Sequence, residues 1–165
     1  MIEIEVIGAD VAAMVLAEIN VPKLIDESLE EMAQELVGMA KTNLRDEPFN
    51  SYPIELEQSI EYSRPSKYNA RVKADAGFAA YVEYGTGIVG RGSPHPEAAE
   101  RGVVYDRNNH GNKGWRYFKK GKFRFTRGQT SKPFMYETAQ QIPKLAGRVF
   151  GRRLKKMLNE ARTNE

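Results

Sequence analysis

The sequence predicts an α+β domain in which a long N-terminal helix and a C-terminal helix pack against a small antiparallel β-sheet. Three observations lead to this fold class. Apolar residues recur every three or four positions over residues 22–44 and again after residue 133. Two segments, 57–75 and 114–127, alternate apolar and polar residues around a turn. The length suits a single domain spanning 1–165.

The first third of the chain predicts one strand and two helical segments. Residues 2–6 alternate isoleucine or valine with glutamate, as a half-buried strand does. Residues 11–19 are apolar and compatible with a helix. Pro22 suits the first turn of the long helix at 22–44. The proline-containing segment 47–54 is expected to be a loop that ends this helix.

The middle of the chain predicts two hairpins separated by a long glycine-rich loop. The first hairpin is expected to turn at residues 64–67, and the second at residues 119–121. Both are expected to contribute to one sheet. Residues 78–84 fit either a strand or one to two helical turns, because periodicity cannot settle so short a segment. The loop at 86–113 is expected to project from the domain.

The last helix is expected to begin at Pro133 and to run, with a break, to about residue 161. Pro143 lies inside this span, where a proline either kinks a helix or occupies the first turn of a new one. The apolar residues of the segment follow helical spacing.

Composition excludes several classes of site. The chain has no cysteine, which excludes disulfides, thiolate metal sites and cysteine nucleophiles, and only two histidines. No apolar run approaches the length of about 18 residues that a membrane helix needs. The acidic N-terminal segment lacks the basic region of a signal peptide. We therefore expect a protein with no membrane contact that is made and used in a cytoplasm.

Charge is distributed unevenly along the chain. Residues 1–100 hold 8 basic and 18 acidic side chains, a net charge of −10, whereas residues 101–165 hold 17 basic and 4 acidic ones, a net charge of +13. Such asymmetry is typical of proteins with an acidic or nucleic-acid partner. It also fits two halves of opposite sign that lie against each other, or against another copy of the chain. The sequence leaves these alternatives open.

Residues 85–90 contain the spacing G-x-G-x-x-G, which in dinucleotide-binding folds cradles a pyrophosphate. That mechanism requires a helix to open at the third glycine. Here Gly92, Pro94 and Pro96 follow Gly90 closely, and we expect them to prevent such a helix. The sequence therefore predicts no nucleotide and no other cofactor at this motif.

His95 and His110 raise the alternative of a small hydrolase or metal-dependent nuclease, together with Glu97 and Asp106. Nothing in the sequence fixes the mutual geometry of these side chains. Residues of a polar, glycine-rich loop explain them more simply, and no enzyme activity is expected.

The second hairpin interleaves cations with aromatic rings, as surfaces that bind nucleic acid do. An amphipathic hairpin with its rings buried and its cations in solvent is the simpler interpretation of the alternation at 122–126. The last helix carries a second group of cations. The candidates for subunit or DNA contacts are Lys119, Lys120, Lys122, Arg124, Arg127, Arg148, Arg152 and Arg153.

A more specific pattern is the segment AAYVEYGTG at 79–87, which is followed by Lys132-Pro133-Phe134-Met135 at a helix start. It resembles the tail-completion and head–tail joining (neck) proteins of tailed phages and prophages, whose pattern is A-x-Y-V-E-[FY]-G-T and then P-F-[LM]. Leu56-x-x-Ser59-Ile60 is similar to the strand opening of that family, although the usual preceding glycine is absent. The family core motif maps onto Tyr81, Glu83, Tyr84, Gly85, Thr86, Pro133 and Phe134.

The resemblance implies a structural virion protein that completes the tail or joins head to tail as part of a homo-oligomeric ring. Its partners would be other phage neck or tail proteins and DNA in the channel, with no small-molecule substrate and no catalysis. It would occupy the host cytoplasm during assembly and then the virion. On this interpretation Glu83 anchors a turn by accepting backbone or arginine hydrogen bonds. The alternative function is non-specific nucleic-acid binding by the basic C-terminal half.

Overall fold

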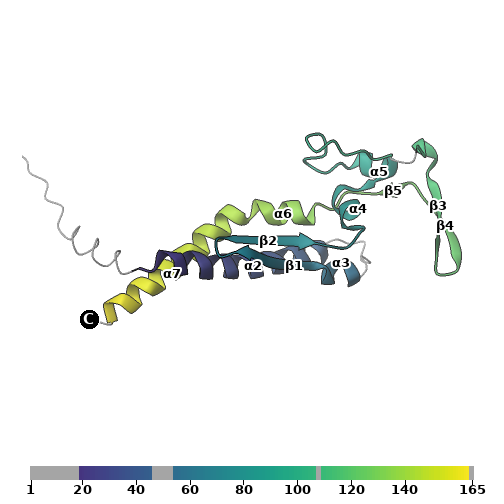
Figure 1. The fold of residues 1–165 in the computed structure, drawn as a ribbon. Helices are drawn as coiled ribbons and strands as arrows, with labels where there is room; N and C mark the ends of the chain where they lie inside the picture. Colours follow the sequence, from purple (N-terminus) through teal and green to yellow (C-terminus); the bar gives the residue numbers. More distant parts are fainter. Residues whose placement is uncertain (1–18, 46–53, 107–108, 164–165) are drawn as a thin grey trace, which may run out of the picture.

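The computed structural model describes residues 19–45, 54–106 and 109–163. The expected strand at 2–6, nearly all of the helix at 11–19 and most of the loop at 47–54 lie outside these ranges. The described residues form an α+β fold, as predicted, with two small antiparallel sheets and two long helices (Figure 1).

The long N-terminal helix is α2, Val21–Arg45. Its start is capped by Asn20, whose side-chain oxygen accepts the backbone N–H of Lys23 at 3.0 Å. Pro22 occupies the first turn, where a proline costs no helical hydrogen bond. The predicted helix at 22–44 is therefore confirmed to within one residue at each end.

A short helix and a hairpin follow. Helix α3 is Ile54–Gln58, and β1 (Ile60–Ser66) pairs antiparallel with β2 (Asn69–Ala74). The turn lies at residues 67–68 and not at 64–67 as predicted. Pro65 sits where the register shifts between residues 63 and 66, so the proline is accommodated at an irregularity within β1.

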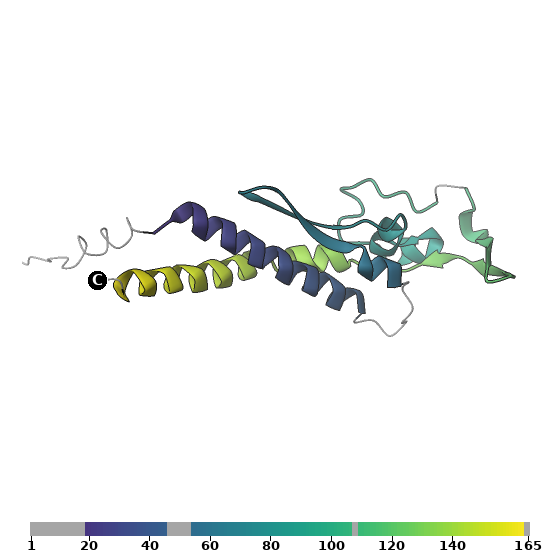
Figure 2. The same ribbon diagram turned by 60° about the horizontal axis from the view of Figure 1, so that its bottom comes forward.

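The C-terminal segment forms two helices, as the predicted break requires. Helix α6 is Phe134–Gln140 and α7 is Ile142–Thr163. Pro143 lies in the first turn of α7, which resolves the alternative between a kink and a new start. Helix α2 packs against both, and Figure 2 shows it crossing α7 in the opposite chain direction.

The core of the helical part consists of two adjacent clusters. The larger one joins α2, α3, β1, α4 and α6 through the buried side chains Ala40, Leu44, Leu56, Ile60, Ala79, Val82 and Phe134. The smaller one joins α2 to α7 through Met32, Leu145 and Val149. Burial of these faces explains why the helical apolar spacing was visible in the sequence.

The segment between β2 and α6 folds differently from the prediction. It contains helices α4 (Ala79–Tyr84) and α5 (Gly87–Gly92), a 3-10 turn η1 (Gly111–Lys113) and strand β5 (Gly128–Gln129). The prediction that residues 86–113 form a loop is therefore wrong where α5 and η1 are found. Two isolated bridges, Thr86 to Gln129 and Gly87 to Gly128, hold its start against the later chain.

The second hairpin stands apart from the first. Strand β3 (Trp115–Lys119) pairs with β4 (Lys122–Thr126) in a separate two-stranded sheet, so the expected single sheet is wrong. Its two-residue turn has Lys120 at φ 52° and Gly121 at φ 75°, the positive values that a tight hairpin turn requires. Figures 1 and 2 show this hairpin projecting at the end of the molecule opposite the C-terminus.

Candidate functional site

The Y-V-E-Y-G-T segment forms a joint between α4 and α6. Helix α4 places the Glu83 side chain, which is 7% exposed, against the start of α6. One carboxylate oxygen accepts the N–H of Met135 at 3.0 Å, and the other accepts the N–H of Tyr136 at 2.9 Å. These N–H groups belong to the first turn of α6, where a helix offers no internal acceptor. Glu83 is thus a helix cap supplied from a distant segment.

His95 completes this joint. Its Nδ1 accepts the backbone N–H of Glu97 at 3.0 Å, so in the neutral ring the proton is on Nε2. Nε2 lies 3.2 Å from Oε1 of Glu83 and donates to it. The ring lies between Tyr84, at a centroid distance of 4.5 Å, and Tyr136, at 5.2 Å. His95 is 2% exposed, so this pair is enclosed and does not face an open substrate site.

The expectation that Glu83 accepts backbone hydrogen bonds is confirmed, although it caps a helix and does not anchor a turn. No sequence pattern indicated that His95 would be its partner, because the two residues come from α4 and from the chain after α5. The polar, glycine-rich composition around His95 instead predicted an exposed loop residue.

The G-x-G-x-x-G glycines serve close backbone packing. Gly87 has φ +63°, and a Cβ there would lie 2.3 Å from the carbonyl oxygen of Arg127. A Cβ on Gly85 would lie 2.6 Å from the backbone nitrogen of Ser131, and one on Gly90 would lie 3.0 Å from the carbonyl oxygen of Gln129. The three glycines therefore let residues 127–131 approach α5.

The expectation that glycines and prolines prevent a helix here is wrong in part. Helix α5 begins at Gly87 and ends at Gly92, two residues before Pro94. It spans only six residues, and the backbone of residues 127–131 occupies the space beside its glycines. The structure therefore gives the glycine spacing a packing role that the sequence did not predict.

The remaining motif residues support the same joint. The Thr86 hydroxyl accepts the N–H of Gln129 at 3.2 Å, and the Gln129 side chain donates to the Tyr81 carbonyl at 2.7 Å. Phe134, at 1% exposure, belongs to the larger core cluster, and Pro133 is the residue that precedes α6. The Tyr81 ring is half exposed and is accessible from solvent.

His110 and Asp106 form a separate local structure. The Asp106 carboxylate accepts the backbone N–H groups of His110 and Gly111, each at 2.7 Å. The His110 ring stacks on Trp115 at a centroid distance of 5.3 Å. Glu97 pairs with Arg101. Within 19–45, 54–106 and 109–163, no group of three histidine, aspartate or glutamate side chains is placed to hold a metal ion.

The arginines of α7 pair with the acidic face of α2 in the same chain. Arg153 contacts Glu31 at 2.6 Å and Glu27 at 2.8 Å. Arg148 pairs with Glu35, and Arg152 pairs with Glu31 and Glu35. The charge asymmetry left several alternatives open. For these residues the structure shows that the two halves of opposite charge lie against each other within one chain. Contacts of Arg148 and Arg152 with a second chain stay a prediction.

The β3–β4 hairpin presents two different faces. Residues directly opposite each other in the register lie on the same face, and alternate residues lie on opposite faces. The pairs Phe118–Phe123 and Arg116–Phe125 therefore share one face, which we call the phenylalanine face. The pairs Tyr117–Arg124 and Lys119–Lys122 share the other, which we call the cationic face together with Lys120 at the turn.

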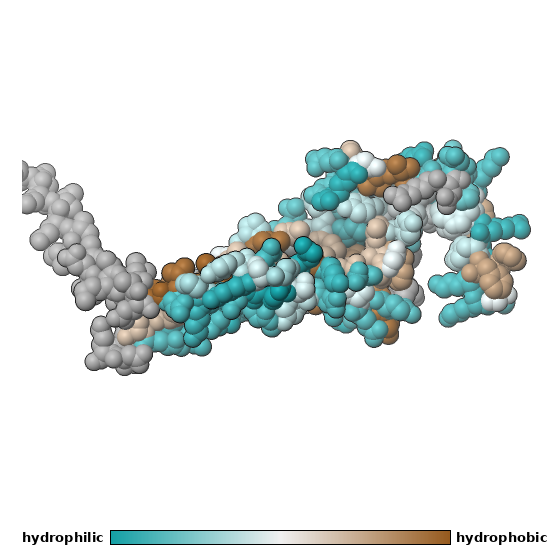
Figure 3. Space-filling view, in the orientation of Figure 1, coloured by the Kyte–Doolittle hydropathy of each residue, from teal (hydrophilic) through white to brown (hydrophobic). Residues whose placement is uncertain are grey.

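The rings of the phenylalanine face are in solvent. Phe118, Phe123 and Phe125 are 64%, 76% and 58% exposed, and the rings of Phe118 and Phe123 touch edge to face at 5.3 Å. The interpretation that the hairpin buries its aromatic residues is therefore wrong for these three phenylalanines, because none of the described elements covers this face. Figure 3 shows the apolar surface of the hairpin bordered by hydrophilic side chains.

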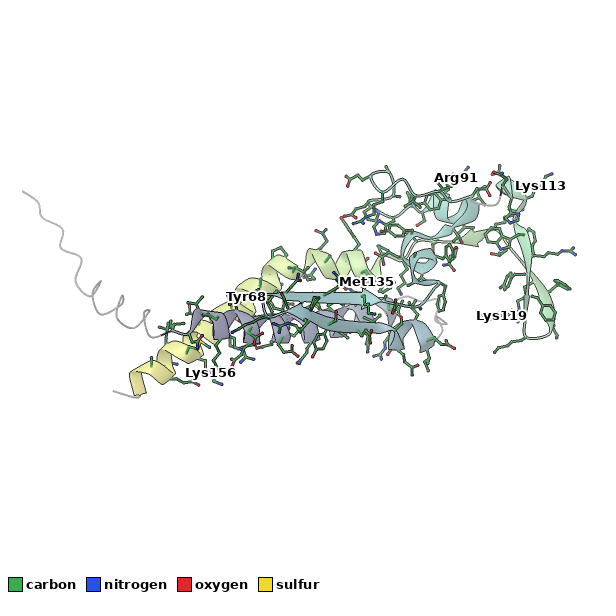
Figure 4. All side chains as sticks on the ribbon, in the orientation of Figure 1. Tyr68, Arg91, Lys113, Lys119, Met135 and Lys156 are labelled. Atoms are coloured by element: carbon green, nitrogen blue, oxygen red, sulfur yellow. The ribbon has the colours of Figure 1, made fainter. Side chains whose placement is uncertain are left out.

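The hairpin and the residues beside it are rich in cations and contain no acidic residue. Residues 113–127 hold seven lysines and arginines and no aspartate or glutamate. All seven are exposed, and none makes an ion pair with another residue in the described part of the chain. Figure 4 shows Lys113 near the base of the hairpin and Lys119 near its free end. Two of the seven, Lys113 and Arg116, were not among the residues predicted to make subunit or DNA contacts, although the absence of acidic residues from 113–127 is visible in the sequence.

None of the helices that the structure describes has the length and apolar character needed to span a bilayer. The chain matches no family model, no curated protein and no solved structure.

Proposed function

We propose that this chain is a structural virion-assembly protein of a tailed phage or prophage. It completes the tail or joins head to tail as one subunit of an oligomeric ring. The resemblance at 79–87 and 132–135 suggests this function. Within the chain, the residues of that motif pack, cap and hydrogen-bond, and these are structural roles.

The observation that carries the proposal is the uncovered phenylalanine face. A two-stranded hairpin is marginally stable alone in water. Three phenylalanine side chains on one face leave a cluster of apolar surface that a neighbouring chain would cover. Fully burying one such side chain is worth about 1.5–3 kcal/mol. A contact of this kind, repeated head to tail, closes into a ring when the rotation between subunits permits.

The test replaces Phe118, Phe123 and Phe125 together by threonine in the phage or prophage genome. Threonine favours strands, so the hairpin keeps its β preference while losing its apolar face. The matched control is Tyr68→Thr, which alters an exposed ring (59% exposed) at the turn of the other hairpin.

We expect the triple variant to keep the helical circular dichroism spectrum and the urea midpoint of the unaltered protein. Electron microscopy of lysates should show heads and tails that are separate or tails that are incomplete. The control should yield normal particles. Infectious particles at the normal titre from the triple variant, with the protein present, would contradict the proposal.

The alternative, in which non-specific nucleic-acid binding is the principal function, relies on the opposite face of the same hairpin. It predicts that the phenylalanine variant keeps its biological role and that a charge variant loses it. The two sets of substitutions therefore separate the two functions.

A further inference from the structure

The cations of the described residues differ in whether an acidic side chain lies beside them. The arginines of α7 that face α2 are matched by its glutamates: Arg148 by Glu35, Arg152 by Glu31 and Glu35, and Arg153 by Glu27 and Glu31. Arg64 is likewise matched by Asp26 at 2.5 Å and Glu30 at 3.1 Å. Acidic side chains of the helical part are thereby largely used within the chain. The seven exposed cations at 113–127 have no such match in the described residues, so this segment carries seven unpaired positive charges within 15 residues.

We propose that the cationic face of the β3–β4 hairpin binds duplex DNA through its phosphates, without sequence preference. Its core consists of Lys119, Lys122 and Arg124, with Lys120 at the turn. This inference rests on charge and geometry alone and does not depend on the proposed assembly role.

The shape of the hairpin suits a duplex. The major groove of B-DNA admits a two-stranded β-ribbon. The β3–β4 pair is such a ribbon, five residues long in each strand, and it stands clear of the helical part (Figure 1). A positively charged ribbon can approach the phosphates on either side of a groove without displacing any other element of the chain.

The residue types favour DNA over an acidic protein. Lysine is depleted in protein–protein interfaces, whereas protein–DNA interfaces are much more positively charged. Four of the seven cations are lysines: Lys113, Lys119, Lys120 and Lys122. Lysine and arginine neutralise phosphates and release counterions, which supplies essentially all of the affinity of sequence-independent binding.

The uneven distribution of rings and cations over the two faces, with Arg116 alone among the phenylalanines, favours a duplex over a single strand. Single-strand binding combines aromatic rings with cations so that bases stack while phosphates are neutralised. Here the three exposed phenylalanines lie on the face opposite Lys119, Lys122 and Arg124. The ring that pairs across the strands with Arg124 is Tyr117. Phosphate contact therefore accounts for this face better than base stacking does.

The experiment measures the binding of the full chain to a fluorescent duplex of mixed sequence by anisotropy, over a series of salt concentrations. Four phosphate contacts predict a slope of log K against log salt of about −3 to −4. The triple variant Lys119→Gln, Lys122→Gln, Arg124→Gln should weaken binding at least about tenfold near 0.1 M salt. It should also make the slope shallower by roughly 2 to 3.

The matched control carries the same change in net charge on the helical part: Lys67→Gln, Lys144→Gln, Lys155→Gln. These three lysines are also exposed. We expect it to bind within about twofold of the unaltered chain, because its substitutions lie outside the proposed contact. Equal weakening by the two triple variants would overturn the assignment to the hairpin, and so would the absence of any binding by the unaltered chain.

Three further results would also count against the inference. They are equal displacement of the duplex by polyglutamate at the same charge concentration, tighter binding of a single strand than of the duplex, and loss of binding in the threonine variant of the phenylalanine face. Because binding is measured on purified protein, its failure leaves the assembly proposal intact. Normal particles from the phenylalanine variant would equally leave DNA binding intact.

Discussion

Substitution of Glu83 is the sharpest test of how α4 is joined to the start of α6. Replacing it by alanine removes the acceptor of two backbone N–H groups in the first turn of α6 and of the His95 Nε2–H. Hydrogen bonds to a charged group contribute about 1.5–3 kcal/mol each, and the donors left behind are in a largely buried site. Contributions of this kind are not additive, and removing one partner of a buried charged pair costs about 3–5 kcal/mol in all, which is the loss we expect in the free energy of unfolding for Glu83→Ala.

Urea denaturation followed by circular dichroism measures this loss. The urea midpoint should fall, while the slope of the unfolding free energy against urea concentration stays constant because the surface exposed on unfolding is unchanged. A thermal scan should show a decrease of roughly 6–20 °C for a protein of this size. Glu83→Gln keeps the shape and one oxygen acceptor, so it should lose about 2 kcal/mol and remain measurable if the alanine variant unfolds.

The control is Glu61→Ala, which removes an exposed ion pair with Lys73. Such pairs contribute about 0–1 kcal/mol. If Glu83→Ala and Glu61→Ala have the same unfolding free energy within about 0.5 kcal/mol, the capping role assigned to Glu83 is refuted.

Two further predictions concern the glycines and the acid stability. Gly87→Ala should destabilise the protein by at least about 2 kcal/mol more than Gly102→Ala, because both have φ near +60° but only at Gly87 would the Cβ meet backbone within 3 Å; equal urea midpoints would contradict this. The Tyr62 hydroxyl, with help from Gln34 and Arg64, holds the pKa of Glu30 below its ordinary value against the opposing effect of burial. The Glu30 carboxylate therefore binds a proton more readily in the unfolded chain than in the folded one. The stability that Glu30 adds is present at neutral pH and is lost as the pH falls below about 4. Glu30→Gln should flatten this acid limb of the urea midpoint, and an unchanged pH profile would argue against it.

Local patterns predicted most of the helices and hairpins. The apolar spacing over 22–44 predicted α2 to within one residue at each end, and the short turn before Lys122 predicted the β3–β4 hairpin. Pro143 indicated a break in the last helix but left open whether it kinks the helix or begins a new one, and α7 begins anew there. Periodicity and turn chemistry act within a few residues, so a single sequence displays them directly.

Patterns of the same kind did not reveal which segments meet. Alternation at 122–126 showed that the hairpin has two faces but not that the phenylalanine face is uncovered. The spacing of Gly85, Gly87 and Gly90 did not show that the backbone of residues 127–131 packs against these glycines. The seven residues 78–84 were compatible with either strand or helix, and burial of Ala79 and Val82 in the core accompanies the helical form.

Sequence alone determined the long helices, the two hairpins, the uneven charge and the absence of cysteine chemistry, because each depends on neighbouring residues or on composition. Tertiary structure decided that the α7 arginines pair with α2, that Glu83 caps α6 beside His95, and that the hairpin keeps its cations and rings in solvent. These outcomes depend on pairings between residues far apart in the chain. Composition can show that opposite charges exist, but only the folded backbone determines which of them come within contact distance.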